Sequence, residues 1–296
     1  MTRQFGPLSG KALRTSLAAA ACCLMLAGSA AAQAPAAGAP PPPDPNPGAL
    51  TFTGNNDVMV KTPYIFRGIV QELEPELTLW PSGDLGIAVY SGKGGLKTAS
   101  INFGVWNSLQ TGSSGLDGAN NKLHYEEDFY TALGLGFSKA TFTTTYTAYT
   151  SPNAGFLTVH ELAFKVAVTN KVAPYVVLAQ ELGKNGADGG ANKGTYVELG
   201  IGPSWSLAKG KATVAIPVKV GLSAHNYYEL NGEDNAFGFF DVGALLTVPL
   251  SGVPASYGAW NFHVGGDVLA FGDTTKAIAG DKSSKGVFLF GFGVTY

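Results

Sequence analysis

The sequence predicts an all-β protein, an antiparallel transmembrane β-barrel of about twelve strands, and three observations favour this fold. Apolar and polar residues alternate along segments of about ten residues or more, which is typical of membrane β-strands. The composition combines 14% charged residues and 40 Gly with a mean hydropathy of only +0.12, whereas soluble domains carry about 25% charged residues and about 7% Gly. The chain also ends in an alternating aromatic segment, VFLFGFGVTY. Low net hydrophobicity excludes a helical membrane bundle, which needs apolar runs of ~20 residues.

The first 32 residues have the pattern of a secretory signal peptide. Three basic residues precede an apolar run from Leu17 to Ala27, and Ala30-Ala31-Ala32 offers an A-x-A cleavage site. We expect cleavage of residues 1–32, which removes both cysteines of the chain. It also removes three basic and no acidic residues, so the formal net charge falls from −2 to −5. Such a weakly acidic chain lacks the clustered basic footprint of a nucleic-acid-binding protein.

Residues 33–49 are rich in proline and contain four consecutive prolines, Pro40 to Pro43. Proline runs prevent helix and sheet and favour extended polyproline II. We expect a stiff periplasmic spacer in front of a barrel domain that spans residues 50–296. A plug or a contact with the cell wall is the alternative function of this stretch.

The alternation within the barrel domain predicts twelve strands, although ten or fourteen would fit the pattern as well. The expected strands are 51–69, 75–91, 96–110, 122–138, 139–152, 156–169, 172–183, 194–208, 211–229, 236–250, 254–273 and 283–296. Most connections alternate between short turns and longer loops, as periplasmic turns and extracellular loops do in outer-membrane barrels. The connections 70–74 and 153–155 depart from this rule, because they are short where long loops are expected. Pro217 falls in mid-strand and requires a bulge or a local change of register, since proline cannot donate to the ladder.

The C-terminal segment is the most specific motif. One face of the last strand carries only aromatic and aliphatic side chains that end at the final residue, namely Phe288, Phe290, Phe292, Val294 and Tyr296. A terminal aromatic residue preceded by such an alternation resembles the signal that the barrel-assembly machinery reads in Gram-negative porins. We therefore expect the protein to be inserted into the outer membrane by that machinery.

Two short elements resemble a known family. The run Tyr64-Ile65-Phe66-Arg67-Gly68-Ile69 is similar to the Tyr-x-Phe-Arg-Gly-Ile element of the TorF-like porin family, and Tyr196-Val197-Glu198 is similar to its Tyr-x-Glu strand. The resemblance implies an outer-membrane barrel with a pore function. It implies no catalytic residue and no defined solute.

Motifs of catalysis and cofactor binding were not found. His160-Glu161 is not followed by the second histidine of H-E-x-x-H, and neither a G-x-S-x-G elbow nor a His-x-Ser pair occurs. We expect no enzyme activity, no metal and no cofactor. A lipid-cleaving barrel would require a serine and a histidine that meet at the outer rim.

The strand register assigns an acidic excess to the lumen, because a charge on the lipid face costs about 2–4 kcal/mol for Arg or Lys at the midplane. The expected inward carboxylates are Asp57, Glu76, Asp84, Glu126, Asp128, Glu161, Glu198, Asp241 and Asp267. The expected inward cations are Lys61, Arg67, Lys165 and Lys219. Fixed charges that line open water bias permeant ions, so we expect weak cation selectivity. The candidate selectivity residues are Arg67, Glu76, Asp84, Glu198, Lys219 and Asp241.

These observations favour a passive channel for small hydrophilic solutes in the outer membrane of a Gram-negative bacterium, in contact with lipid and lipopolysaccharide. The pattern does not identify the solute or the oligomeric state. Two alternatives stay open. In the first, the protein is a closed structural or adhesin-like barrel in which the inward charges pair across a narrow lumen. In the second, it is a secreted soluble β-barrel, whose strands would have similar alternation without a lipid-facing wall.

Overall fold

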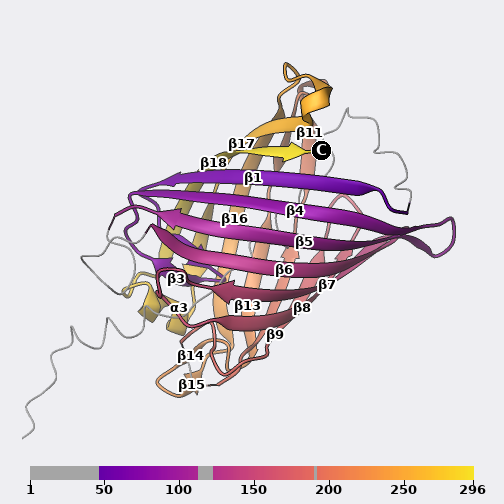
Figure 1. Cartoon of the computed structure of the whole chain (residues 1–296). Helices are drawn as coiled ribbons and strands as arrows, with labels where there is room; N and C mark the ends of the chain where they lie inside the picture. The colour runs from indigo at the N-terminus through magenta and orange to yellow at the C-terminus, as the bar shows by residue number, and fades with distance from the viewer. Residues whose placement is uncertain (1–46, 113–122, 190–191) are drawn as a thin grey trace, which may run out of the picture.

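A computed structural model describes residues 47–112, 123–189 and 192–296. The predicted signal peptide and most of the predicted spacer lie outside these residues. The described chain forms a closed barrel of twelve antiparallel strands, as the alternation predicted, in which strands that follow one another along the chain are neighbours (Figure 1). No helix among the described residues is long and apolar enough to cross a membrane.

Two of the twelve wall strands are interrupted, so the wall contains fourteen strand segments. The segments are β1 (Leu50–Val60), β4 (Leu77–Ser91), β5 (Leu96–Gln110), β6 (His124–Phe137), β7 (Ala140–Thr150), β8 (Val159–Val168), β9 (Tyr175–Glu181), β10 (Thr195–Ile201), β11 (Ser204–Leu207), β12 (Ala212–Ala215), β13 (Val218–His225), β16 (Phe237–Pro249), β17 (Ala259–Phe271) and β18 (Ser284–Thr295). The interruptions fall at Pro203, between β10 and β11, and at Pro217, between β12 and β13. Proline lacks the N–H that a central strand needs, which explains both interruptions. The bulge or change of register predicted at Pro217 is wrong, because the pairs Ala215–Leu245 and Val218–Val242 keep one register with β16.

The barrel closes between the first and the last strand. β18 pairs with both β1 and β17, and Thr295 lies opposite Thr53. Phe52 and Tyr296 exchange two backbone hydrogen bonds of 2.8 Å. Closure leaves no unpaired strand edge along this seam, and it assigns the C-terminal residues to the wall.

The two ends of the barrel differ in the length of their connections. One end, called here the long-loop end, carries the connections 61–76, 111–123, 151–158, 182–194, 226–236 and 272–283. The other, the short-turn end, carries 92–95, 138–139, 169–174, 208–211 and 250–258. The smaller elements are β2 (Tyr64–Phe66), β3 (Ile69–Glu72), β14 (Glu229–Leu230), β15 (Glu233–Asp234), α3 (Asp273–Ile278), η1 (Ala208–Gly210) and η2 (Ala255–Tyr257). The short connections predicted at 70–74 and 153–155 are wrong, because neighbouring residues leave the wall as well.

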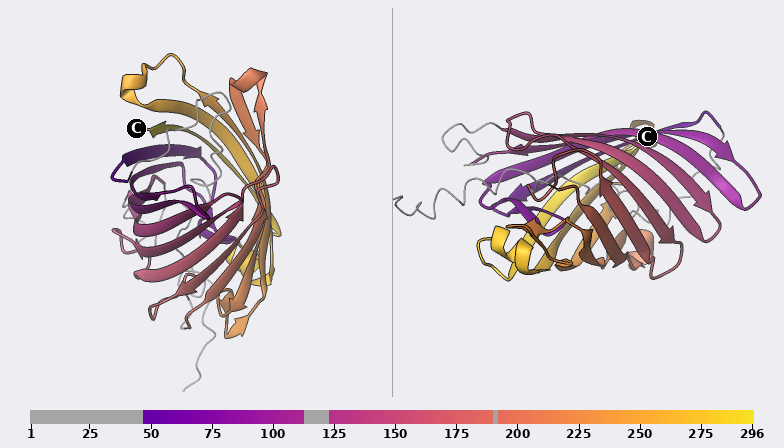
Figure 2. Two further views of the ribbon diagram at one scale, coloured as in Figure 1. Left: turned by 90° about the vertical axis from the view of Figure 1, so that its right-hand side faces the viewer. Right: turned by 90° about the horizontal axis from the view of Figure 1, so that it is seen from below.

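The first connection folds into the barrel. The strand predicted over 51–69 ends at Val60, and β2 and β3 form an antiparallel hairpin inside the wall (Figure 2). Arg67 and Gly68 make its turn with φ of 46° and 79°, the positive values that a tight two-residue hairpin turn requires. A Cβ on Gly68 would lie 2.8 Å from the side chain of Phe239, so the wall leaves room only for glycine there. Every residue of this inward hairpin from Tyr64 to Glu72 is buried.

The wall is apolar outside and polar inside. Large apolar side chains that point outward are exposed on strands around the barrel, among them Phe52, Leu85, Phe103, Phe129, Leu178, Leu199, Phe240, Val268, Phe288 and Phe292. Charged side chains are buried within the barrel, among them Glu126, Asp128, Glu161, Lys165 and Asp241. A soluble protein does not expose so much contiguous apolar surface, whereas lipid-facing apolar and lumen-facing polar residues alternate in a transmembrane barrel.

Candidate functional site in the lumen

The inward hairpin crosses the lumen and contacts the wall on opposite sides. On one side the Tyr64 ring packs against Trp80 of β4 and Trp106 of β5, with ring centres 5.1 and 6.0 Å apart. Its hydroxyl donates to Glu126 of β6 at 2.9 Å. On the other side, the hydroxyl of Tyr228, just after β13, donates to the Arg67 carbonyl at 2.8 Å. The hairpin therefore constricts the lumen at the long-loop end.

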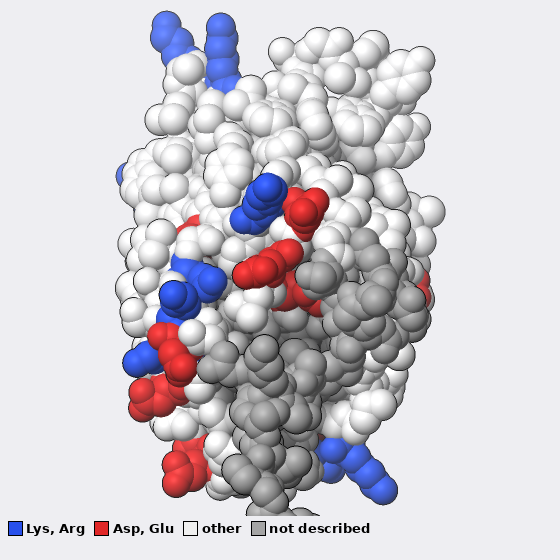
Figure 3. All heavy atoms as spheres, turned by 90° about the vertical axis from the view of Figure 1, so that its left-hand side faces the viewer, with Lys and Arg blue, Asp and Glu red and all other residues white. Residues whose placement is uncertain are grey.

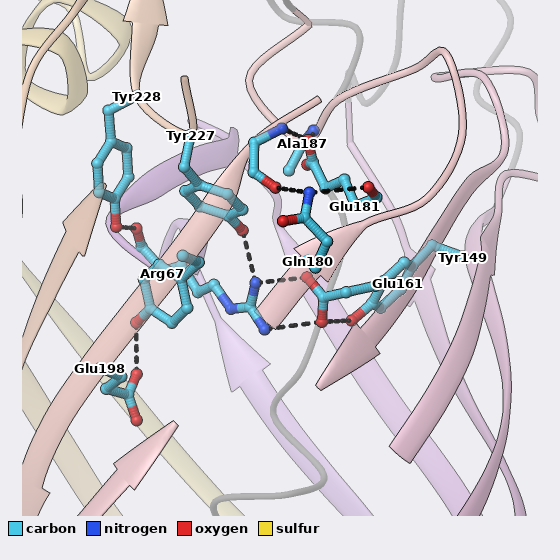
Figure 4. A network of polar contacts seen from close by, with 11 residues as sticks. Arg67, Tyr149, Glu161, Gln180, Glu181, Ala187, Glu198, Tyr227 and Tyr228 are labelled. Atoms are coloured by element: carbon cyan, nitrogen blue, oxygen red, sulfur yellow. Dashed lines mark hydrogen bonds and ion pairs between the residues drawn. The ribbon is translucent and has the colours of Figure 1, made fainter. Parts of the chain in front are cut away.

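Arg67, at the tip of the hairpin, forms an ion pair with Glu161 of β8 (Figure 4). Its Nη1 and Nη2 atoms donate to the two carboxylate oxygens at 2.7 and 3.0 Å. The exposed fractions of the two side chains are 4% and 3%. Such a bidentate geometry gives the strong form of a charge-assisted hydrogen bond, and each buried charge is compensated by the other.

Aromatic side chains enclose the same guanidinium group. Its central carbon lies 4.1 Å from the ring centre of Tyr196 of β10, within the range of a cation–π contact. Nη1 also donates to the hydroxyl of Tyr227 at 2.9 Å, and Tyr149 of β7 donates to Glu161 at 3.2 Å. We call Tyr149, Glu161, Tyr196 and Tyr227 the Arg67 cage.

The groups of this site that lie outside the membrane-spanning strands hold defined protonation states. Burial opposes the charge of Arg67, but the adjacent Glu161 carboxylate favours it and the pKa of Arg67 is raised well above its ordinary value. Burial raises the pKa of Tyr227 and of Tyr228 well above the usual range. The hairpin tip is therefore a cation that contacts neutral tyrosine hydroxyls.

A second set of charges lies on the wall strands beyond the cage. Glu198 accepts hydrogen bonds from Tyr196 at 2.6 Å and from Tyr175 at 2.9 Å. Lys219 of β13 and Asp241 of β16 are register partners, and their charged groups are 3.2 Å apart. The Lys219 side chain keeps 30% of its surface exposed, and Glu198 is half-buried. Lys219 and Glu198 therefore reach water inside the barrel, whereas the Asp241 side chain is only 5% exposed.

The opposite wall carries further polar contacts. Asp84 of β4 accepts hydrogen bonds from Asn102 at 2.7 Å and Tyr130 at 2.8 Å. Asp57 of β1 contacts the Nε2 atom of His263 at 2.6 Å. Asp84 and Asp57 are also half-buried. Carboxylates therefore line the lumen on several strands.

Five of the six candidate selectivity residues lie inside the barrel, and their effect on ion selectivity stays a prediction. Asp84, Glu198, Lys219 and Asp241 point inward from the wall, whereas Arg67 enters on the hairpin. Glu76 is wrong as a lumen residue, because β4 begins at Leu77 and Glu76 is exposed on the long-loop end. Lys61 is exposed there too, since β1 ends before it.

Glu181, at the end of β9, is an inward carboxylate of the wall that was not predicted from the sequence. It is buried, and its oxygens accept hydrogen bonds from the backbone N–H groups of Ala187 at 2.6 Å and Gly194 at 2.5 Å. Glu181 has an odd residue number, as do Tyr175 and Val177 on the inward face of the same strand. This alternation was the available sequence signal. These bonds hold Ala187 and Gly194 next to β9.

Figure 3 views the molecule from the side on which β3 and α3 lie in Figure 1. On the described part of this face, acidic and basic side chains are interspersed, so it offers no large patch of one sign. Among the described residues, no group of three His, Cys, Asp or Glu side chains forms a candidate metal site.

Together, the lipid-facing wall, the polar lumen and the closed sheet define a transmembrane β-barrel of the outer-membrane type. Similar solved structures include an outer membrane channel from Pseudomonas putida F1, which is 11% identical, with 86% of this chain and 99% of that chain covered and a TM-score of 0.47. The NanC porin is 10% identical, with 83% and 99% covered and a TM-score of 0.39. The β domain of the Bordetella autotransporter BrkA is 15% identical, with 84% and 98% covered and a TM-score of 0.37.

No family model and no curated protein matches the sequence. The resemblance to the TorF-like family thus finds no support in these comparisons and stays a prediction. What is established is the class, an outer-membrane β-barrel.

Proposed function

We propose that the protein is a porin-like passive channel for small hydrophilic solutes, with a weak preference for cations. The observation that supports it best is the set of half-buried carboxylates Asp57, Asp84, Glu198 and Asp267, which reach water inside an apolar wall. Charged side chains that line a water-filled lumen bias the ions that pass. The predicted acidic excess of the lumen remains after the corrections, which place Glu76 and Lys61 outside the lumen and Glu181 inside it.

The TorF-like motif fits this proposal. Its residues Tyr64 to Ile69 form β2 and the turn of the inward hairpin, the part of the chain that narrows the lumen. A motif at a constriction is expected where a family shares a pore function.

Planar-bilayer recording under a KCl gradient tests the proposal. The refolded protein should give discrete conductance steps and a reversal potential that favours K⁺. The double variant Glu198→Gln/Asp241→Asn should shift the reversal potential toward zero. The matched control Glu74→Gln/Glu76→Gln removes the same charge from exposed loop positions and should leave the potential near the wild-type value. Equal potentials in both double variants would refute the selectivity assignment.

One observation favours a second candidate function, a closed structural or binding barrel. Inward charges pair at Arg67–Glu161 and at Lys219–Asp241, and the hairpin fills the long-loop end. A protein that inserts, shows heat-modifiable mobility and passes no KCl current would support this candidate over the channel.

A further inference from the structure

Three of the four residues of the Arg67 cage lie on wall strands, and none lies on the hairpin. Glu161 lies on β8, Tyr149 on β7 and Tyr196 on β10. Tyr227 lies in the connection 226–236, two residues after the end of β13. The members also hold one another in place without Arg67. Tyr149 donates to Glu161, and the rings of Tyr196 and Tyr227 lie 4.9 Å apart. The cage would therefore persist if the hairpin moved.

The chemistry of the cage matches one class of ligand. A carboxylate with both oxygens presented side by side binds the planar fork of a guanidinium, whereas an ammonium group is a point charge. The Tyr196 ring adds a π face at 4.1 Å from the cation, and the Tyr227 hydroxyl accepts a further hydrogen bond. The site thus combines the three features that recognise a guanidinium group.

The buried position of Glu161 also requires a cation. A carboxylate that is 3% exposed and has lost its partner is an uncompensated buried charge, which is strongly unfavourable. Arg67 supplies the cation from a segment tethered at both ends, between Val60 of β1 and Leu77 of β4. A tether of this kind gives its group a high effective concentration at the site.

We propose that the Arg67 cage is a binding site for solutes that carry a guanidinium group, and that Arg67 occupies it as a tethered ligand. A solute that displaces Arg67 takes over the pair with Glu161 and frees the hairpin from β8. This inference rests on the proposed channel function and assigns it a solute class. Glu198, hydrogen-bonded to the cage residue Tyr196, would attract such cations to the cage.

The test compares L-arginine with L-citrulline, which has the same shape but replaces the guanidinium by a neutral ureido group. In bilayers, arginine should interrupt the KCl current through the Arg67→Ala variant at a concentration at least about tenfold lower than in the wild type, because the tethered competitor is gone. Citrulline should have no comparable effect on either protein. In detergent, arginine but not citrulline should raise the heat-modification midpoint of Arg67→Ala.

Two further variants separate the cage from the rest of the lumen. Arg67→Ala/Glu161→Gln should lose the difference between arginine and citrulline, whereas Arg67→Ala/Asp84→Asn should keep it, because Asp84 lies outside the cage. If Arg67→Ala does not refold, Arg67→Lys keeps the charge without the fork, and arginine should still compete better than citrulline.

The outcomes are distinguishable from failure of the channel itself. Absence of KCl current in every variant would refute the proposed function, and the detergent midpoints would still test the cage. KCl current with equal effects of arginine and citrulline on Arg67→Ala would overturn the inference and leave the channel proposal standing. An arginine effect that survives Glu161→Gln would overturn it as well.

Discussion

Arg67 and Glu161 are 94 positions apart in the sequence and are joined by two hydrogen bonds of 2.7 and 3.0 Å inside the barrel. One is at the tip of a hairpin that has left the wall, and the other is on wall strand β8. The pair therefore attaches a connecting segment to the opposite side of the lumen. It determines where the constriction lies.

Replacing Arg67 by alanine should destabilise the protein by about 3–5 kcal/mol, since it leaves the buried Glu161 carboxylate without a cation. The double variant Arg67→Met/Glu161→Leu removes both charges and should be much less destabilised. Urea-unfolding midpoints of refolded protein in detergent measure the difference. Destabilisation of the double variant by the sum of the single effects would contradict a coupled pair.

The strands of the wall could be predicted from the sequence for a physical reason. Inward and outward residues alternate with a period of two, so the position of Asp84 or Lys219 follows from a few neighbours along its own strand. Pro217 likewise marks its own interruption, because the missing N–H is a property of the residue. Such local rules predicted the twelve strands and most of the inward charges.

The inward hairpin could not be predicted from the sequence in the same way. The aromatic run at Tyr64 to Phe66 continues the alternation of β1, so the pattern predicted one long strand. Pro63 and the Arg67-Gly68 pair were the local signs of a break and a turn, but Gly is common throughout the chain and several other prolines also fall within predicted strands. Pairing of Arg67 with Glu161 depends on the closure of the barrel, which no local pattern contains. Glu76 was misassigned because the alternation predicted a strand that begins at residue 75, whereas β4 begins at Leu77.

The Tyr228 ring packs directly against Gly238 of β16, and a Cβ at Gly238 would lie 2.0 Å from the ring carbon Cζ. Gly238→Ala should displace the ring, break its hydrogen bond to the Arg67 carbonyl and cost about 1–3 kcal/mol by overpacking. The control is Gly202→Ala, where nothing lies within 4 Å of the added carbon. Unfolding midpoints and KCl conductance should change in the first variant only. Equal changes in both variants would show that the packing of Tyr228 against Gly238 does not hold the hairpin in place.

Lys219→Gln should increase the preference for K⁺, opposite in sign to the effect of neutralising Glu198 and Asp241. Its side chain is 30% exposed, and its charge offsets nearby carboxylate charge. The loss of stability should be smaller than in Arg67→Ala, because the Lys219 side chain is partly solvated, although the change leaves the buried Asp241 carboxylate without its cation. Lys93→Gln, at an exposed turn of the short-turn end, is the charge-matched control and should leave the reversal potential unchanged. A shift toward anions in Lys219→Gln would contradict the selectivity proposal.

Replacing Tyr296 can distinguish a role of its side chain in assembly from a contribution to stability. Its side chain is 71% exposed, and its contacts with Phe52 are made by the backbone, so Tyr296→Ser should change the stability of refolded protein by less than about 0.5 kcal/mol. If the terminal aromatic face is read during insertion, the same variant should sharply reduce the amount of protein in the outer membrane of cells. Tyr257→Ser removes a ring that is 68% exposed at the same end of the barrel and should leave that amount unchanged. Similar losses in the two variants would indicate that aromatic rings at this rim serve the membrane interface alone, because assembly machinery would not treat an internal turn as a C-terminal strand.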